Sequence, residues 1–119
     1  MSEGPNGTDA RRLNHTVHTC GDLQLDLDAR VAFIGGSRVI LTFEEFELLR
    51  RLVADPGRAF TRAELRASDA RPSSDRTVDS RIMRLRKKLS GAHSFTIETV
   101  PLVGYRCWAA NTAVEAVRP

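Results

Sequence analysis

Residues 76–89 read RTVDSRIMRLRKKL, and this stretch is the strongest single clue to the fold. Its aliphatic residues Val78, Ile82, Leu85 and Leu89 recur at steps of four, three and four. Residues spaced in this way share one face of a helix that has about 3.6 residues per turn. The pattern therefore predicts an amphipathic helix over residues 76–89, with one narrow apolar stripe facing the core.

The same segment is strongly basic. Residues 76–88 hold six Lys or Arg residues against one acid, Asp79. Ser80, Arg84 and Lys87 fall opposite the apolar stripe, with Arg76 nearby. Arg81 and Lys88 flank that outward side, and Arg86 lies nearer the apolar edge. The major groove of B-DNA is about 12 Å wide, which admits one helix, and Arg can bond bidentately to guanine there. The segment therefore suits a DNA recognition helix, and the alternative is a helix whose charged face is only solvated.

The charge of the chain is divided unevenly along its 119 residues, a length typical of one domain. Residues 1–55 carry six basic and nine acidic residues, a net charge of −3, whereas residues 56–119 carry twelve and six, a net charge of +6. This asymmetry predicts a polyanionic partner. We expect nucleic acid rather than a membrane, because the helix stripe lacks Trp and Phe. The sequence contains no apolar run of transmembrane length and no signal peptide, so we expect a cytoplasmic protein.

Other chemically active residues are few. Cys20 and Cys107 are the only cysteines, and we expect them to be free, packed thiols. His15 and His18 lie near Cys20, but no fourth ligand is spaced to join them, so we expect no metal. The sequence has no glycine-rich phosphate loop and no histidine at a spacing tied to catalysis. We therefore expect neither an enzyme nor a cofactor.

The residues ahead of the basic segment predict strands and then two helices. Three short alternating segments predict an antiparallel meander: residues 23–27, 31–34 and 38–41. A threonine followed three residues later by a glutamate is a capping box, which marks the start of a helix. Thr42 with Glu45 begins a helix that runs to about residue 54. Thr61 with Glu64 begins a short helix that runs to about residue 67, followed by a polar loop over residues 68–75.

The residues after the basic segment predict a hairpin. Residues 95–100 alternate as a strand, residues 101–104 turn, and residues 105–108 return. We expect residues 1–19 to be a flexible tail or linker remnant and residues 110–119 to be a second flexible tail. The domain between them, residues 20–109, is expected to be α+β: a winged helix-turn-helix with an N-terminal antiparallel strand platform, three helices and a C-terminal β-hairpin wing.

In this order, the sequence pieces resemble the OmpR/PhoB-type effector domain of bacterial two-component response regulators. The likeness covers roughly residues 21–108. The matching pieces are Leu41-Thr42, Glu45 to Leu49, Pro56-Gly57, Thr61-Arg62, Leu65, Arg76 to Asp79, Ile82, Leu85 to Leu89, Thr99-Val100 and Gly104 to Arg106. The resemblance implies a transcription regulator that binds double-stranded promoter DNA sequence-specifically, often as tandem copies on repeated half-sites.

The resemblance also implies which residues contact DNA. Family contacts carry over at Arg76, Arg81, Arg84 and Arg86 of the helix, and wing-side phosphate contacts carry over at Thr99 and Tyr105. By its position opposite the stripe, Arg84 is the best candidate for a base contact, whereas Arg86 and Lys88 suit phosphate. The full predicted DNA-binding surface consists of Arg76, Thr77, Ser80, Arg81, Arg84, Arg86, Lys87, Lys88, Thr99, Tyr105 and Arg106.

Three departures from the family pattern qualify this expectation. Pro101-Leu102 replaces the Arg-Gly of the usual wing, whose Arg reaches the minor groove. Ala67-Ser68-Asp69 is polar where the family usually has an apolar residue followed by Trp, and the next loop is two or three residues short. Contact with RNA polymerase through that loop is therefore in doubt. Met83 replaces a usually basic residue, and it either touches a thymine methyl or packs, with packing favoured.

These departures leave a second hypothesis open. The chain would then be a winged-helix module for protein interaction, with only weak, non-specific DNA binding.

Overall fold

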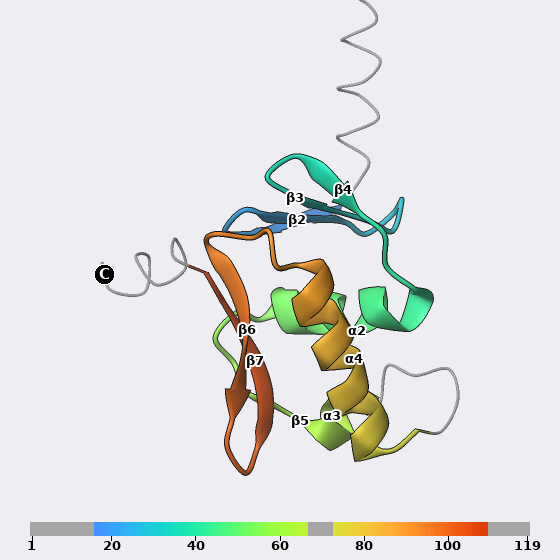
Figure 1. Ribbon diagram of the computed structural model, residues 1–119, viewed down its shortest axis with the longest axis vertical. Helices are drawn as coiled ribbons and strands as arrows, with labels where there is room; N and C mark the ends of the chain where they lie inside the picture. The colour runs from blue at the N-terminus through green and yellow to red at the C-terminus, as the bar shows by residue number, and fades with distance from the viewer. Residues whose placement is uncertain (1–15, 67–72, 110–119) are drawn as a thin grey trace, which may run out of the picture.

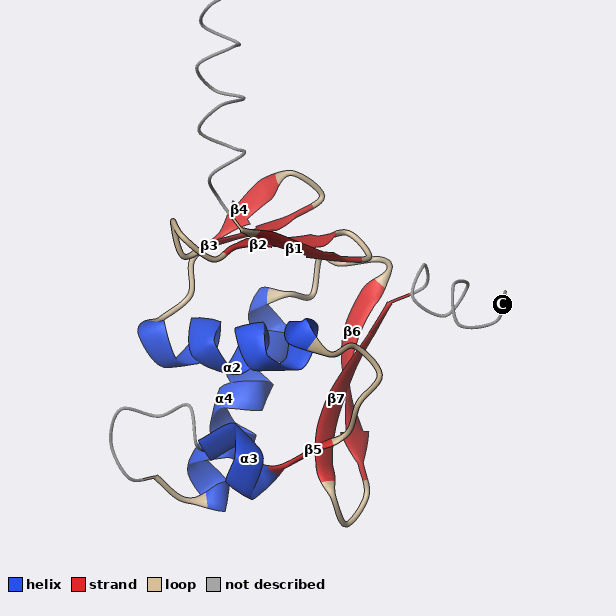
Figure 2. Cartoon of the chain, turned by 180° about the vertical axis from the view of Figure 1, so that it is seen from behind, coloured by secondary structure: helices blue, strands red, loops and turns tan. Residues whose placement is uncertain are grey.

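The computed structural model describes residues 16–66 and 73–109. A four-stranded sheet lies across one end of the helices, and a hairpin runs alongside them (Figure 1). The same arrangement is visible from behind (Figure 2). The described part of the chain therefore has the predicted α+β architecture.

The N-terminal sheet has the antiparallel order β1-β2-β3-β4. Its strands are β1 (Val17–Cys20), β2 (Leu23–Asp26), β3 (Val31–Ile34) and β4 (Ser37–Val39). Leu23 and Leu25 of β2 are buried and Gln24 between them is exposed, as the alternating pattern predicted.

Strand β1 corrects the expected boundary of the N-terminal tail. We placed residues up to 19 in the tail, but β1 begins at Val17 and pairs with β2, Thr19 lying opposite Gln24. The pattern hid this strand because Cys20 is its one buried residue. Residues 1–15 and 110–119, the remainder of the two expected tails, lie outside the described residues.

Two of the three helices begin at the predicted capping boxes. For α2 (Phe43–Ala54), Thr42 Oγ1 accepts from the Glu45 N–H at 3.1 Å, and Glu45 Oε1 accepts from the Thr42 N–H at 2.9 Å. For α3 (Arg62–Arg66), the Thr61 and Glu64 side chains make the same exchange at 3.0 and 2.9 Å. Each box satisfies backbone donors that a helix start leaves without partners.

Helix α4 (Asp75–Lys88) is the predicted basic helix. Ser74 caps it, so it begins one residue earlier than expected. Val78, Ile82, Leu85 and Leu89 are all buried in the common core. Full burial of such a side chain contributes about 1.5–3 kcal/mol, so the stripe fixes which face of α4 remains available to solvent.

The second sheet has the order β5-β7-β6 and contains the predicted hairpin. Its strands are β5 (Phe60–Thr61), β6 (Phe95–Val100) and β7 (Gly104–Ala109). Strand β5 was not among the predicted strands, but Phe60 pairs with Tyr105 of β7. Gly104 permits this pairing, because a Cβ there would lie 2.0 Å from the Phe60 carbonyl oxygen.

The loop expected over residues 68–75 lies mostly outside the described residues, which resume at residue 73. Within the ranges 16–66 and 73–109, no helix has both the length and the apolar character needed to cross a bilayer.

Candidate nucleic-acid interface

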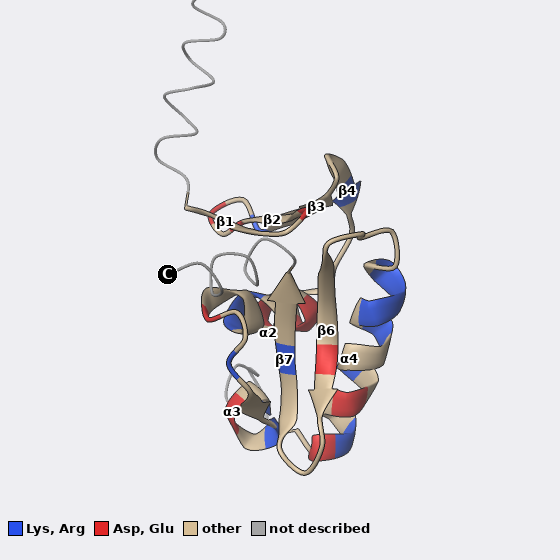
Figure 3. Ribbon diagram, turned by 90° about the vertical axis from the view of Figure 1, so that its left-hand side faces the viewer, with Lys and Arg blue, Asp and Glu red and all other residues tan. Residues whose placement is uncertain are grey.

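The outward face of α4 carries the basic residues that remain available to a partner. The side chains of Arg76, Arg84 and Lys87 are exposed and form no hydrogen bond or ion pair within the described residues. Met83 lies among them and is 69% exposed, so the prediction that it packs is wrong. Figure 3 shows Lys and Arg on successive turns of α4.

On one flank, α4 is hydrogen-bonded to the hairpin through Arg86. Its Nε donates to the Ile97 carbonyl oxygen at 3.1 Å, and its Nη2 donates to Thr99 Oγ1 at 2.9 Å. Arg86 and Thr99 were both expected to contact phosphate. In the structure these two side chains are hydrogen-bonded to each other, and the bond holds β6 against α4.

The same flank carries a cluster around Asp79. The Tyr105 hydroxyl donates to Asp79 Oδ1 at 2.6 Å, and Arg62 Nε donates to the same oxygen at 2.7 Å. These two hydrogen bonds hold the pKa of Asp79 below its ordinary value. The Arg62 and Arg86 guanidinium groups lie over the Tyr105 ring, 5.3 and 5.5 Å from its centroid.

This cluster changes the role expected of Tyr105. The side chain is buried and its hydroxyl is already bonded to a carboxylate, so a direct phosphate contact does not fit this geometry. Neither Arg62 nor Asp79 was predicted as a partner of Tyr105. They lie on different helices, seventeen positions apart, and no local pattern relates them.

On the opposite flank, Lys88 is bonded to α2. Lys88 Nζ lies 2.6 Å from Glu45 Oε1, and Glu45 is only 2% exposed. Burial alone raises the pKa of Glu45, but hydrogen bonds from Lys88 and Thr42 outweigh it, and the net pKa is below the ordinary value. Lys88, for which a phosphate contact was expected, thus forms an ion pair with Glu45 of α2.

The other predicted site residues differ in their exposure and in their hydrogen-bond partners. Thr77 Oγ1 lies 3.3 Å from Ser74 Oγ, which caps α4. Ser80 is half-buried, and Arg81 is half-buried and has an interaction partner. Arg106 Nε donates to Glu98 Oε1 at 2.8 Å across the hairpin. Of the predicted residues, Arg76, Arg84 and Lys87 therefore form the most available surface.

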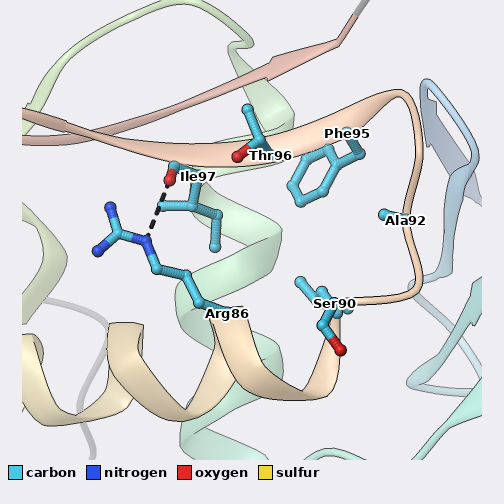
Figure 4. Close-up of a pocket in the computed structure, with 7 residues that line it drawn as sticks. Arg86, Ser90, Ala92, Phe95, Thr96 and Ile97 are labelled. Atoms are coloured by element: carbon cyan, nitrogen blue, oxygen red, sulfur yellow. Dashed lines mark hydrogen bonds between the residues drawn. The ribbon is translucent and has the colours of Figure 1, made fainter.

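A hollow of about 330 Å³ lies between the end of α4 and β6. Figure 4 shows Arg86 at one end of it, bonded to Ile97, and Phe95 and Ser90 toward the other. Arg86 is the one charged side chain in the lining. The lining therefore offers the Ser90 and Thr96 hydroxyls no carboxylate or imidazole to act as a general base.

Neither cysteine forms a disulfide, and both thiols are buried, as predicted. A hydrogen bond with Cys20, together with burial, raises the pKa of the Cys107 thiol. Within residues 16–66 and 73–109, no three His, Cys, Asp or Glu residues are placed to hold a metal ion. His15 lies outside this part of the chain.

A strand platform, a helix pair ending in a basic helix, and a hairpin bonded to that helix define the winged helix-turn-helix class. Residues 36–107 match the family model described as "Transcriptional regulatory protein, C terminal", and the chain belongs to this family of transcription regulators.

Individual relatives agree with this membership. The chain is 39% identical over 89 residues to the transcriptional regulatory protein VxrB of Vibrio cholerae, covering 71% of this chain and 35% of VxrB. It is 30% identical over 105 residues to the sensory transduction protein RegX3 of Mycobacterium tuberculosis, covering 84% of this chain and 46% of RegX3. The chain thus spans about a third to a half of the curated relatives it matches.

Solved structures share the fold. The AdeR DNA-binding domain, in complex with an intercistronic region, has a TM-score of 0.70 and 30% identity over 77% of this chain and 98% of that one. The Klebsiella pneumoniae RstA DNA-binding domain, in complex with the RstA box, has a TM-score of 0.67 and 30% identity over 79% and 98% of the two chains. The fold of this chain is therefore that of OmpR/PhoB-type DNA-binding domains.

Proposed function

We propose that this chain binds double-stranded promoter DNA sequence-specifically as the DNA-binding part of a bacterial transcription regulator. Helix α4 occupies the major groove and the β6–β7 hairpin lies on the adjacent backbone. One observation carries the proposal: Arg76, Arg84 and Lys87 share an exposed face and are not neutralised within the described residues. The DNA complexes of AdeR and RstA, which share this fold, support it.

The contacts divide by position on the helix. Arg84 reads a base edge, because it lies away from both flanks that are bonded to the protein. Arg76 and Lys87 contact phosphates, which fix register without reading sequence. Lys88, Tyr105 and Arg106 act as positioning residues through Glu45, Asp79 and Glu98.

Fluorescence anisotropy with a duplex recovered from a random pool tests the proposal. We expect Arg84→Ala to weaken binding by about 1–3 kcal/mol and to relax specificity at one base. Arg38→Ala is the control, because Arg38 is an exposed arginine on β4 and belongs neither to α4 nor to the β6–β7 hairpin. Failure of the wild-type protein to bind any duplex at low salt contradicts the proposal.

A second candidate function is a protein-interaction module with weak, non-specific DNA binding. The exposed apolar residues Leu102 and Val103, at the turn between β6 and β7, favour it. Partners that persist after nuclease treatment, together with an inert Arg84→Ala variant in cells, would support it. We prefer DNA binding because the outward face of α4 is cationic.

The proposed partner sets the remaining expectations. Binding to bacterial promoter DNA would place the chain in the cytoplasm. The proposal includes no catalytic step, metal or cofactor. Tandem copies on repeated half-sites and contact with RNA polymerase stay predictions of the family resemblance. Repeat spacing in the recovered duplex tests the first of these.

A further inference from the structure

The turn that joins β6 to β7 is an apolar, exposed loop. Pro101, Leu102 and Val103 are consecutive and all are exposed, with Leu102 fully so. No charged residue lies between Glu98 and Arg106. A run of exposed apolar residues is unfavourable in a soluble protein unless it has a partner. We call these three residues the wing tip.

The backbone of the wing tip projects Leu102 outward. Leu102 has a φ of 66°, in the left-handed region that non-glycine residues seldom adopt. The Val103 N–H donates to the Val100 carbonyl oxygen at 3.0 Å and closes the turn. A non-glycine residue in this region motivates a functional hypothesis for the turn.

The wing tip is held in a defined place beside α4. Figures 1 and 3 show it at the same end of the molecule as the start of α4. Arg86 bonds β6 to α4, and the Tyr105 hydroxyl bonds β7 to Asp79. These bonds fix the wing tip relative to α4. In the proposed complex, with α4 in a major groove and the hairpin on the adjacent backbone, the wing tip would reach the minor groove across that backbone.

We propose that Leu102 enters this minor groove as an apolar wedge against the base pairs. The inference rests on the proposed function and adds a contact of a different chemistry to it. Leu and Pro are among the side chains that proteins insert between base steps from the minor groove. With no charge between Glu98 and Arg106, the wing tip has little to offer phosphate and is suited to base edges and sugars.

This contact selects DNA by deformability. Pyrimidine–purine steps such as TA and CA are the most easily kinked or unstacked. We therefore expect the recovered duplex to hold such a step where the wing tip lies. A wing that carried an arginine would instead favour the negative potential of a narrow A-tract groove.

Leu102→Asn tests the wedge. Asn removes the apolar side chain without adding charge, and it tolerates the left-handed backbone. Leu102→Gly is a second variant that accepts the same φ. Ile40→Asn is the matched control, because Ile40 is also an exposed aliphatic residue but lies between β4 and α2, away from the wing tip. Thermal melting of each variant verifies folding.

The measurement uses a labelled duplex that carries one recovered half-site, with 2-aminopurine at the predicted step. We expect Leu102→Asn and Leu102→Gly to weaken binding about fivefold, with no change in salt dependence, and Ile40→Asn to bind as the wild type does. We expect wild-type binding to raise the 2-aminopurine fluorescence, because unstacking relieves its quenching, and Leu102→Asn to abolish the rise.

Equal affinity of wild type and Leu102→Asn, with no fluorescence change, would overturn the wedge but leave DNA binding intact. A loss that occurs only on a duplex with two half-sites would also overturn it, because the wing tip would then contact a neighbouring protein copy. If the wild-type protein binds no duplex, the proposed function itself fails, and the wedge fails with it.

Discussion

Glu45 places a carboxylate in the core of the protein, and Lys88 supplies the cation beside it at 2.6 Å. The same carboxylate oxygen accepts the Thr42 N–H at the start of α2. Removing one partner of such a pair leaves a buried charge uncompensated, which costs more than a surface ion pair contributes. Lys88 therefore stabilises the fold, although its sequence position suggested a phosphate contact.

The first prediction concerns Lys88→Met. We expect it to lower the free energy of unfolding at pH 7 by about 2 kcal/mol, as measured by urea denaturation. Lys87→Met, one residue away on the exposed face, should change it by less than about 0.5 kcal/mol. Equal stability of the two variants would contradict the structural role of Lys88.

The pH dependence of that difference follows from the pKa of Glu45. In the wild type this pKa is lowered by folding, so its stabilisation is present above the unfolded value of about 4.3 and is lost as the pH falls through the folded value. Lys88→Met should therefore differ most from the wild type at neutral pH, and the two should converge in acid.

At the scale of elements, the helices could be predicted from residues close together in the sequence. Strands β1 and β5 depend on pairing with residues distant in the sequence. The Thr42 and Thr61 capping boxes and the stripe of α4 each lie within a few residues, so the sequence predicts them directly. Strands β1 and β5 are short and hold one buried residue each, which leaves little pattern to detect. Strand β1 forms by pairing with β2, and β5 forms by pairing with β7.

The candidate site also contains features that the sequence predicts and features that only the fold reveals. The exposure of Arg84 and Lys87 follows from the helix period alone. The partners of Tyr105 and Lys88 lie 26 and 43 positions away, respectively. No spacing rule relates residues so far apart, so only the folded arrangement shows which basic residues are already engaged.

The second prediction concerns the bond between the hairpin and α4. Tyr105→Phe removes the hydroxyl that donates to Asp79 and keeps the ring. We expect the free energy of unfolding to fall by about 1 kcal/mol, as measured by urea denaturation, with faster amide exchange in β6 and β7. Unchanged stability combined with weaker DNA binding would instead restore Tyr105 as a phosphate contact.

At the scale of the whole molecule, charge is separated along the chain. The first 55 residues have a net charge of −3 and the rest a net charge of +6, with the basic residues concentrated on α4. The side chains of three of those residues have no partner within the described part of the chain. Such a surface should attract a polyanion and release its counterions on binding.

The third prediction concerns salt. Each phosphate that the protein neutralises contributes about −0.9 to the slope of log K against log salt concentration. We expect Arg76→Ala and Lys87→Ala each to reduce the steepness by about that amount, measured by anisotropy over a salt series. Arg38→Ala should leave the slope unchanged, and slopes that match across all three variants would exclude phosphate contacts by Arg76 and Lys87.

The central claim is that the exposed face of α4 reads bases in the major groove. The most direct test measures the affinity of wild type and Arg84→Ala for the recovered duplex, with guanines replaced one at a time by 7-deazaguanine, which lacks the N7 acceptor. We predict that one replacement weakens the wild type and has no further effect on Arg84→Ala. Equal sensitivity of the two proteins at every guanine would contradict the claim.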